Sequence, residues 1–302
     1  MNILLYGLTV LFWGTSWLAI KFQLGVVAPE VSVAYRFYLA AAVALIVCAV
    51  GRRPMRYSAR DHAFMALQGL CLFSTNYFLI YLGSQYLTTG LVAVVFSMVV
   101  VFNIFGNALL FGAAMEARVL AGAACGLVGM GLVFWPEIMR FDAAGSGGLG
   151  LSLALAGTGF ASCGMLISAW NQRRRALPVM QINAYGMLYG AAMVTVFSLA
   201  RGRPFDFDPS PAYVISLVYL AVFATVVGFW TYLTLVGRIG PDRAGYATVL
   251  FPMLALALST VFEGYAWTAM AALGVGLVLM GNAIILTKPR GAPTDSPLKR
   301  SR

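Results

Sequence analysis

Apolar runs of about 20 residues recur along this whole sequence, and they restrict the chain to one class of structure. A helix needs about 20 apolar residues to cross the hydrocarbon core of a bilayer. Of the 302 residues, 61% are hydrophobic and only 10% are charged, whereas a soluble domain carries about 25% charged residues. The chain has too few polar residues to cover a globule in water. We therefore predict an all-α, polytopic membrane protein.

The apolar runs predict ten transmembrane helices. They cover residues 3–22, 30–50, 63–83, 88–112, 116–135, 148–170, 179–200, 211–236, 243–263 and 266–287. The breaks between them are short. After the last run, the tail 289–302 holds three prolines, and we expect it to be disordered.

The distribution of positive charge predicts the orientation in the membrane. If the N-terminus is cytoplasmic, only Lys21, Arg140, Arg201 and Arg203 of the 20 Lys and Arg residues lie outside, and Arg36 lies within a span. Because positively charged loops stay inside, both termini are predicted to be cytoplasmic. The net charge of +10 then needs no nucleic-acid partner.

Short sequence matches indicate an internal duplication. Val94–Met98 matches Val249–Met253, and Gly126–Gly131 matches Gly276–Gly281. A Tyr-Leu pair also recurs in the third span of each half. The matches appear in the same order, roughly 150 residues apart, which is the signature of a repeated unit.

The repeat predicts two five-helix units, residues 1–137 and 148–288, joined by a linker at 138–147. A unit with five spans ends on the opposite side of the membrane from where it starts, so the second copy must be inverted. Inverted repeats are typical of secondary transporters, which bind substrate near the bilayer midplane. We therefore predict a transporter that works by alternating access.

Polar and aromatic residues at the middle of several spans predict the substrate site. Polar groups in hydrocarbon cost free energy unless they are paired or hydrated. An uncharged site of this kind suits a neutral or zwitterionic solute with an apolar part. The alternative is that these groups only join helices, at roughly 0.6 kcal/mol each. The candidate residues are Trp13, Trp17, Asn76, Tyr77, Tyr81, Ser97, Ser162, Trp230 and Tyr246.

Three further residues are singled out by charge or backbone chemistry. Lys21 and Arg36 lie near the outer ends of their spans, where they either face a hydrated cavity or reach the interface. Glu30 is close enough in sequence to pair with either. Pro252 removes a backbone donor inside a helix, so we predict a kink there, which either is static or acts as a gate.

The residue types that are absent argue against enzymes and against direct proton coupling. The sequence shows no metal-binding cluster, no plausible catalytic triad and no sign of a cofactor. No Asp or Glu falls at the middle of a span; Glu263, for example, is at a span end, and His62 is at the inner surface. Facilitated export down a gradient is the simpler prediction. A channel and a lipid-modifying enzyme remain alternatives from different classes.

The fifth and tenth spans differ from the other eight. They lack polar groups at mid-depth and carry small residues instead, including Gly122, Gly126, Gly276 and Gly281. We expect these two helices to pack outside the site, against each other within a monomer rather than across a dimer.

Several motifs resemble one family of transporters. Trp13-Gly14, Tyr35-Arg36-Phe37 and Leu250-Phe-Pro-Met253 resemble motifs of the drug/metabolite transporter superfamily, in its EamA-type branch. The resemblance covers about residues 3–288. Within the branch, the chain looks most like the bacterial aromatic amino-acid exporters.

The resemblance implies a bacterial inner-membrane exporter of aromatic amino acids or related metabolites, with a basket-like fold around a central cavity. Other amino acids and purine-like metabolites are the alternative substrates. It carries over Trp17, Asn76, Tyr77 and Tyr81 as cavity residues. The chain departs from the family at Ser97, where many relatives have proline, so a symmetric gating motion is not implied.

Overall fold

The computed structural model describes residues 2–111, 117–133, 135, 146–239 and 247–286, and these residues contain helices and no strand. The all-α prediction is therefore confirmed for this part of the chain. The elements are α1 (Asn2–Lys21), α2 (Pro29–Val50), α3 (Ala59–Gln68), η1 (Gly69–Thr75), α4 (Asn76–Gly83), α5 (Thr89–Ser97), α6 (Val99–Phe111), α7 (Ala117–Val133), α9 (Ser146–Arg175), α10 (Val179–Ala200), α11 (Pro211–Val218), η2 (Tyr219–Val227), α12 (Gly228–Ile239), α14 (Ala247–Phe262) and α15 (Ala269–Leu286).

Seven helical segments are long and apolar enough to cross a membrane. They are Asn2–Lys21, Pro29–Val50, Ala59–Gly83, Thr89–Leu110, Ser146–Gln172, Val179–Ala200 and Pro211–Tyr232. Shorter apolar helices cover Leu120–Val133, Leu250–Phe262 and Ala269–Ile284. Every one of these segments coincides with a predicted run. The predicted tail and residues 138–145 of the predicted linker lie outside the described residues.

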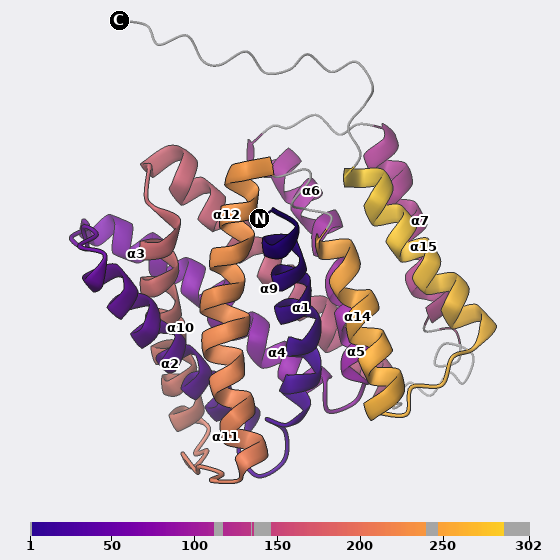
Figure 1. Ribbon diagram of the computed structural model, residues 1–302, viewed down its shortest axis with the longest axis horizontal. Coiled ribbons are helices and arrows are strands. Elements are labelled where there is room, and N and C mark those ends of the chain that lie inside the picture. Colours follow the sequence, from indigo (N-terminus) through magenta and orange to yellow (C-terminus); the bar gives the residue numbers. More distant parts are fainter. Residues whose placement is uncertain (1, 112–116, 134, 136–145, 240–246, 287–302) are drawn as a thin grey trace, which may run out of the picture.

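The first helix packs against helices from the other half of the chain. In Figure 1, α1 lies between α12 and α14 at the centre of the molecule. A Cβ atom on Gly14 would lie 2.7 Å from Cδ2 of Leu254 in α14, so glycine permits the close approach. Thr9 Oγ1 donates a hydrogen bond of 3.1 Å to Thr231 Oγ1 in α12. The two halves of the sequence are thus interleaved in space.

The two glycine-rich helices, α7 and α15, lie side by side at one edge of the molecule (Figure 1). A Cβ atom on Gly129 would meet the carbonyl oxygen of Gly274 at 2.6 Å, and a Cβ on Gly274 would meet that of Gly129 at 2.5 Å. The backbones therefore touch where side chains are missing. This confirms that the glycine faces pack against each other within one chain.

Two segments are wound as π-helices, a feature that the sequence analysis did not anticipate. η1 lies between α3 and α4, and η2 lies between α11 and α12. In η2, Thr225 Oγ1 donates to the carbonyl oxygen of Leu220, five residues earlier, at 2.8 Å. Short π-helical segments occur frequently at functional sites. Each one here precedes a helix that carries candidate residues.

Candidate functional site

Trp17 is enclosed by two phenylalanines from other helices. Its side chain is 7% exposed. Its ring is stacked with Phe251 of α14, with ring centroids 6.2 Å apart and planes at 15°. Phe96 of α5 lies 5.3 Å away on a tilted plane. Offset and tilted arrangements of this kind are favourable for aromatic pairs.

Trp13 extends the same contact one turn earlier along α1. Its ring lies 4.9 Å from Tyr232 and 5.7 Å from Phe229, both in α12. It also meets Phe251 edge-on at 6.3 Å. Four helices therefore contribute rings to one aromatic cluster, which we define as Trp13, Trp17, Phe96, Phe229, Tyr232 and Phe251.

A buried arginine lies near this cluster. Arg36 is 3% exposed, and its Nη2 donates to Thr225 Oγ1 in η2 at 3.1 Å. Its Nη1 reaches the hydroxyl of Tyr81 at 3.5 Å. The guanidinium carbon lies 4.5 Å from the ring centre of Tyr77 and 5.4 Å from that of Phe37. We call these five residues the arginine site.

Aromatic contacts connect the arginine site to the aromatic cluster. Phe37 lies 5.4 Å from Phe73, and Phe73 lies 6.3 Å from Phe229, measured between ring centroids. Trp17, Tyr77, Tyr81 and the charge of Arg36 thus belong to one continuous group of side chains. A solute in contact with this group would meet flat apolar surfaces and one positive charge.

The predicted polar residues mostly satisfy their own hydrogen bonds. Ser97 is fully buried and donates to a backbone carbonyl of its own helix at 2.6 Å. Ser162 donates to Asn103 Oδ1 at 2.8 Å. Asn76 donates from Nδ2 to a carbonyl of the preceding turn at 3.1 Å, but its Oδ1 is buried without a partner. Only the Ser162 contact joins two helices, α9 and α6, whereas the other two stay within one span. A direct role of these residues in binding stays a prediction.

One predicted aromatic residue is not brought to the cluster. Trp230 is 49% exposed, and its neighbours Thr231 and Tyr232 face the interior of the molecule instead. Tyr232, rather than the predicted Trp230, lies beside Trp13. Tyr246 lies outside the described residues.

Pro252 lies inside α14 and is buried. The preceding residue, Phe251, contacts both tryptophans of α1. Any change of direction in α14 at Pro252 would therefore move one wall of the aromatic cluster.

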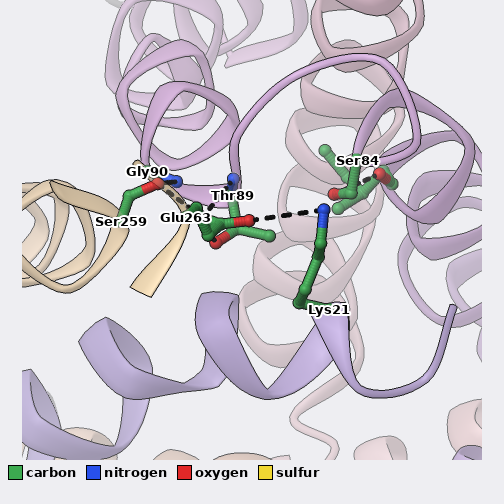
Figure 2. A network of polar contacts seen from close by, with 7 residues as sticks. Lys21, Ser84, Thr89, Gly90, Ser259 and Glu263 are labelled. Atoms are coloured by element: carbon green, nitrogen blue, oxygen red, sulfur yellow. Dashed lines mark hydrogen bonds and ion pairs between the residues drawn. The ribbon is translucent and has the colours of Figure 1, made fainter. Parts of the chain in front are cut away.

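A second polar group lies where α1 and α14 end and α5 begins (Figure 2). Glu263 Oε2 accepts hydrogen bonds from Thr89 N at 2.9 Å and Thr89 Oγ1 at 2.6 Å, and a short one from Ser259 Oγ. Gly90 N donates to Ser259 Oγ at 3.3 Å. Lys21 Nζ lies 3.8 Å from Glu263 Oε1. We call these five residues the Glu263 network, which ties three helices together.

The prediction that Glu30 pairs with Lys21 or Arg36 was wrong. Its carboxylate lies 3.3 Å from Nε of Arg203 and 3.7 Å from Nη1 of Arg201, rather than beside Lys21 or Arg36. The physical reason is that Glu30 starts α2 and faces the loop after α10, whereas Arg36 points into the bundle more than a turn later. A cavity of 410 Å³ opens beside this ion pair.

Within the ranges that the structure describes, no three His, Cys, Asp or Glu side chains gather where they could hold a metal ion.

Comparisons with known proteins give one consistent result. The chain is 25% identical over 281 residues to a "Probable amino-acid metabolite efflux pump" of Escherichia coli K12, covering 91% of each chain. It is 26% identical over 295 residues to the "Uncharacterized inner membrane transporter YedA" of the same organism, covering 94% of this chain and 92% of that one. It is also 21% identical over 263 residues to "Protein PagO" of Salmonella typhimurium, covering 87% and 85%.

A solved crystal structure shares the fold, with a TM-score of 0.67 over 94% of this chain and 96% of that chain, at 20% sequence identity. The family description "EamA-like transporter family" matches residues 1–135 and 148–287. The chain is thus a membrane-embedded transporter rather than an enzyme, and it belongs to the EamA-like transporter family.

Proposed function

We propose that this protein exports amino acids with an apolar side chain, above all aromatic amino acids, from the bacterial cytoplasm across the inner membrane. The observation that carries the proposal is the continuous group of rings that links four helices to a buried arginine. Flat apolar walls with a few placed polar groups are what such a solute needs. The name of the E. coli relative, "Probable amino-acid metabolite efflux pump", supports the same substrate class.

The proposed mechanism is alternating access by two inverted five-helix repeats. The family match divides into residues 1–135 and 148–287, close to the two predicted units. η1 and η2 also begin 150 residues apart, at Gly69 and Tyr219, which supports equivalent positions in the two repeats. One repeat would rock against the other about the aromatic cluster.

In this proposal the Glu263 network closes the outer side. With cytoplasmic termini, the end of α1 and the start of α5 face outward, so Glu263 joins helices there (Figure 2). Outward release of the solute then requires these hydrogen bonds to separate. The Arg201 and Arg203 pairs to Glu30 lie on the same proposed side.

Counterflow in proteoliposomes tests the substrate class. Vesicles loaded with unlabelled solute are expected to accumulate labelled tryptophan or phenylalanine transiently and saturably, because a carrier exchanges solutes one at a time. Threonine and a purine serve as comparison solutes, and empty vesicles as the control. A strong threonine or purine signal without an aromatic signal would contradict the proposed substrates, and flux that does not saturate would indicate a channel.

The energy source is proposed to be the solute gradient alone. A pH difference imposed across sealed vesicles is therefore expected to leave tryptophan at equal concentrations on both sides. Accumulation driven by the pH difference would contradict facilitated export.

Replacing Pro252 by alanine tests the proposed gate. The substitution restores a backbone donor in α14, so we expect the exchange rate to fall severalfold while the amount of protein in the membrane stays unchanged. Initial rates of counterflow and quantitative immunoblots measure the two quantities. Unchanged rates would show that the proline has only a static role.

A further inference from the structure

Arg36 carries a buried positive charge inside α2. Among the described residues, no carboxylate lies within ion-pair distance of its guanidinium, which is 3% exposed. A charged residue inside a membrane segment is costly, and it persists where it serves a substrate or ion pathway. The other buried charges that we described, Glu30 and Glu263, both have ionic partners.

The hydrogen-bonding capacity of Arg36 is also mostly unused. A guanidinium carries five N–H donors. Thr225 accepts one of them at 3.1 Å, and Tyr81 accepts another at a long 3.5 Å. Nε is buried and has no acceptor. Leaving buried donors unsatisfied costs free energy. The N–H groups of Arg36 are therefore satisfied only when a bound molecule supplies a further acceptor.

The surroundings hold the guanidinium in one orientation. Thr225 fixes Nη2 from η2, and the ring of Tyr77 lies 4.5 Å from the guanidinium carbon on the α4 side. A planar guanidinium held in this way presents a fork of parallel N–H groups, which matches the two oxygens of a carboxylate. Thr225 and Tyr77 are thus positioning residues, and the free donors of Arg36 are the binding groups.

We propose that Arg36 binds the carboxylate of the transported solute and so makes a carboxylate a requirement for transport. The inference rests on the proposed function and narrows it to amino acids and related carboxylic acids. The apolar part of the solute then lies toward Phe37, Phe73 and the aromatic cluster. A solute without a carboxylate would leave the buried charge of Arg36 unpaired. A site with a buried polar group rejects ligands that leave this group without a partner, so it selects strongly for solutes that carry the carboxylate.

Competition in tryptophan counterflow tests the assignment. Unlabelled tryptophan and indole-3-propionate, which keep the carboxylate, are expected to compete about 100-fold better than tryptamine and tryptophanamide, which lack it. In Arg36→Gln this ratio is expected to fall close to one. A purely structural effect of the substitution would change the amount of folded protein. The ratio of the two competition strengths does not depend on that amount.

Two further variants keep the test decisive. Arg36→Lys retains the charge but loses the fork of parallel N–H groups, so we expect the ratio to fall at least about tenfold. If Arg36→Gln does not fold, Arg36→Lys provides the test in its place. Arg60→Gln removes an exposed charge at the start of α3 and is expected to keep the ratio of the unchanged protein.

The possible failures are distinguishable. If the unchanged protein exchanges tryptophan and the ratio survives in both Arg36 variants, the carboxylate assignment is wrong and the proposed function stands. If the protein exchanges a purine and no amino acid, the proposed function and the assignment both fail.

Discussion

Replacing Glu263 by alanine is expected to open the molecule at the end where α1 and α14 finish and α5 begins. The side chain is 4% exposed, and its Oε2 accepts hydrogen bonds from Thr89 and Ser259. A hydrogen bond to a charged group contributes about 1.5–3 kcal/mol. Losing about 3 kcal/mol would shift the ratio of closed to open forms about 100-fold, since each 1.4 kcal/mol is tenfold.

Labelling of a buried cysteine measures this opening. Ala93 is 0% exposed and lies one turn beyond Thr89 on α5. In a background without native cysteines, Ala93→Cys should react slowly with a membrane-impermeant maleimide added from outside. The same cysteine combined with Glu263→Ala is expected to react much faster.

Two control variants distinguish the effect of losing the Glu263 hydrogen bonds from the effect of removing a charge nearby. Lys21→Gln is expected to change labelling little, because its side chain is 51% exposed at 3.8 Å from Glu263, and exposed ion pairs contribute about 0–1 kcal/mol. Glu30→Ala is the second control, because it removes another buried carboxylate that pairs with the loop after α10 and not with the Glu263 network. Labelling that is equally fast in all three variants would refute a specific role for Glu263.

The second large effect is expected for Gly274→Leu, which should destabilise the packing of α7 on α15. A Cβ atom there would lie 2.5 Å from the carbonyl oxygen of Gly129 and 2.7 Å from the backbone nitrogen of Val133. Backbone atoms cannot rotate away as a flexible side chain can. We therefore expect a cost at the upper end of the usual range for overpacking, about 3 kcal/mol, seen as a lower melting temperature in detergent.

Gly276→Leu is the matched control for this prediction. It makes the same substitution two residues along the same helix, where a Cβ atom would meet nothing within 4 Å. We expect its melting temperature to stay near that of the unchanged protein. Equal losses in both variants would mean that leucine is harmful anywhere in α15 and that the glycine contact is unimportant.

Helix positions could be predicted from the sequence because hydrocarbon imposes a length on each span. The predicted runs 30–50 and 179–200 agree with α2 and α10 within one residue. The two π-helices could not be predicted, because one extra residue per turn leaves the hydropathy of a uniformly apolar span unchanged. The glycine contact could be predicted, because close backbone packing needs small residues.

The faces of the helices were harder to predict than their positions. Lipid and protein interior are equally apolar, so a tryptophan such as Trp230 satisfies either one, and neither composition nor depth reveals that Tyr232 is the inward residue. Arg36 was easier, because a charge must point away from lipid. The pairing of Glu30 with Arg203 depends on how segments far apart in the sequence meet, so it cannot be predicted from a local sequence pattern.

The contact between Gly129 and Gly274 joins α7, in the first of the two proposed repeats, to α15, in the second. It belongs equally to both halves of the polypeptide and needs no covalent connection between them. A gene divided between the two proposed repeats would therefore yield two fragments whose glycine faces are already complementary and could associate in the bilayer.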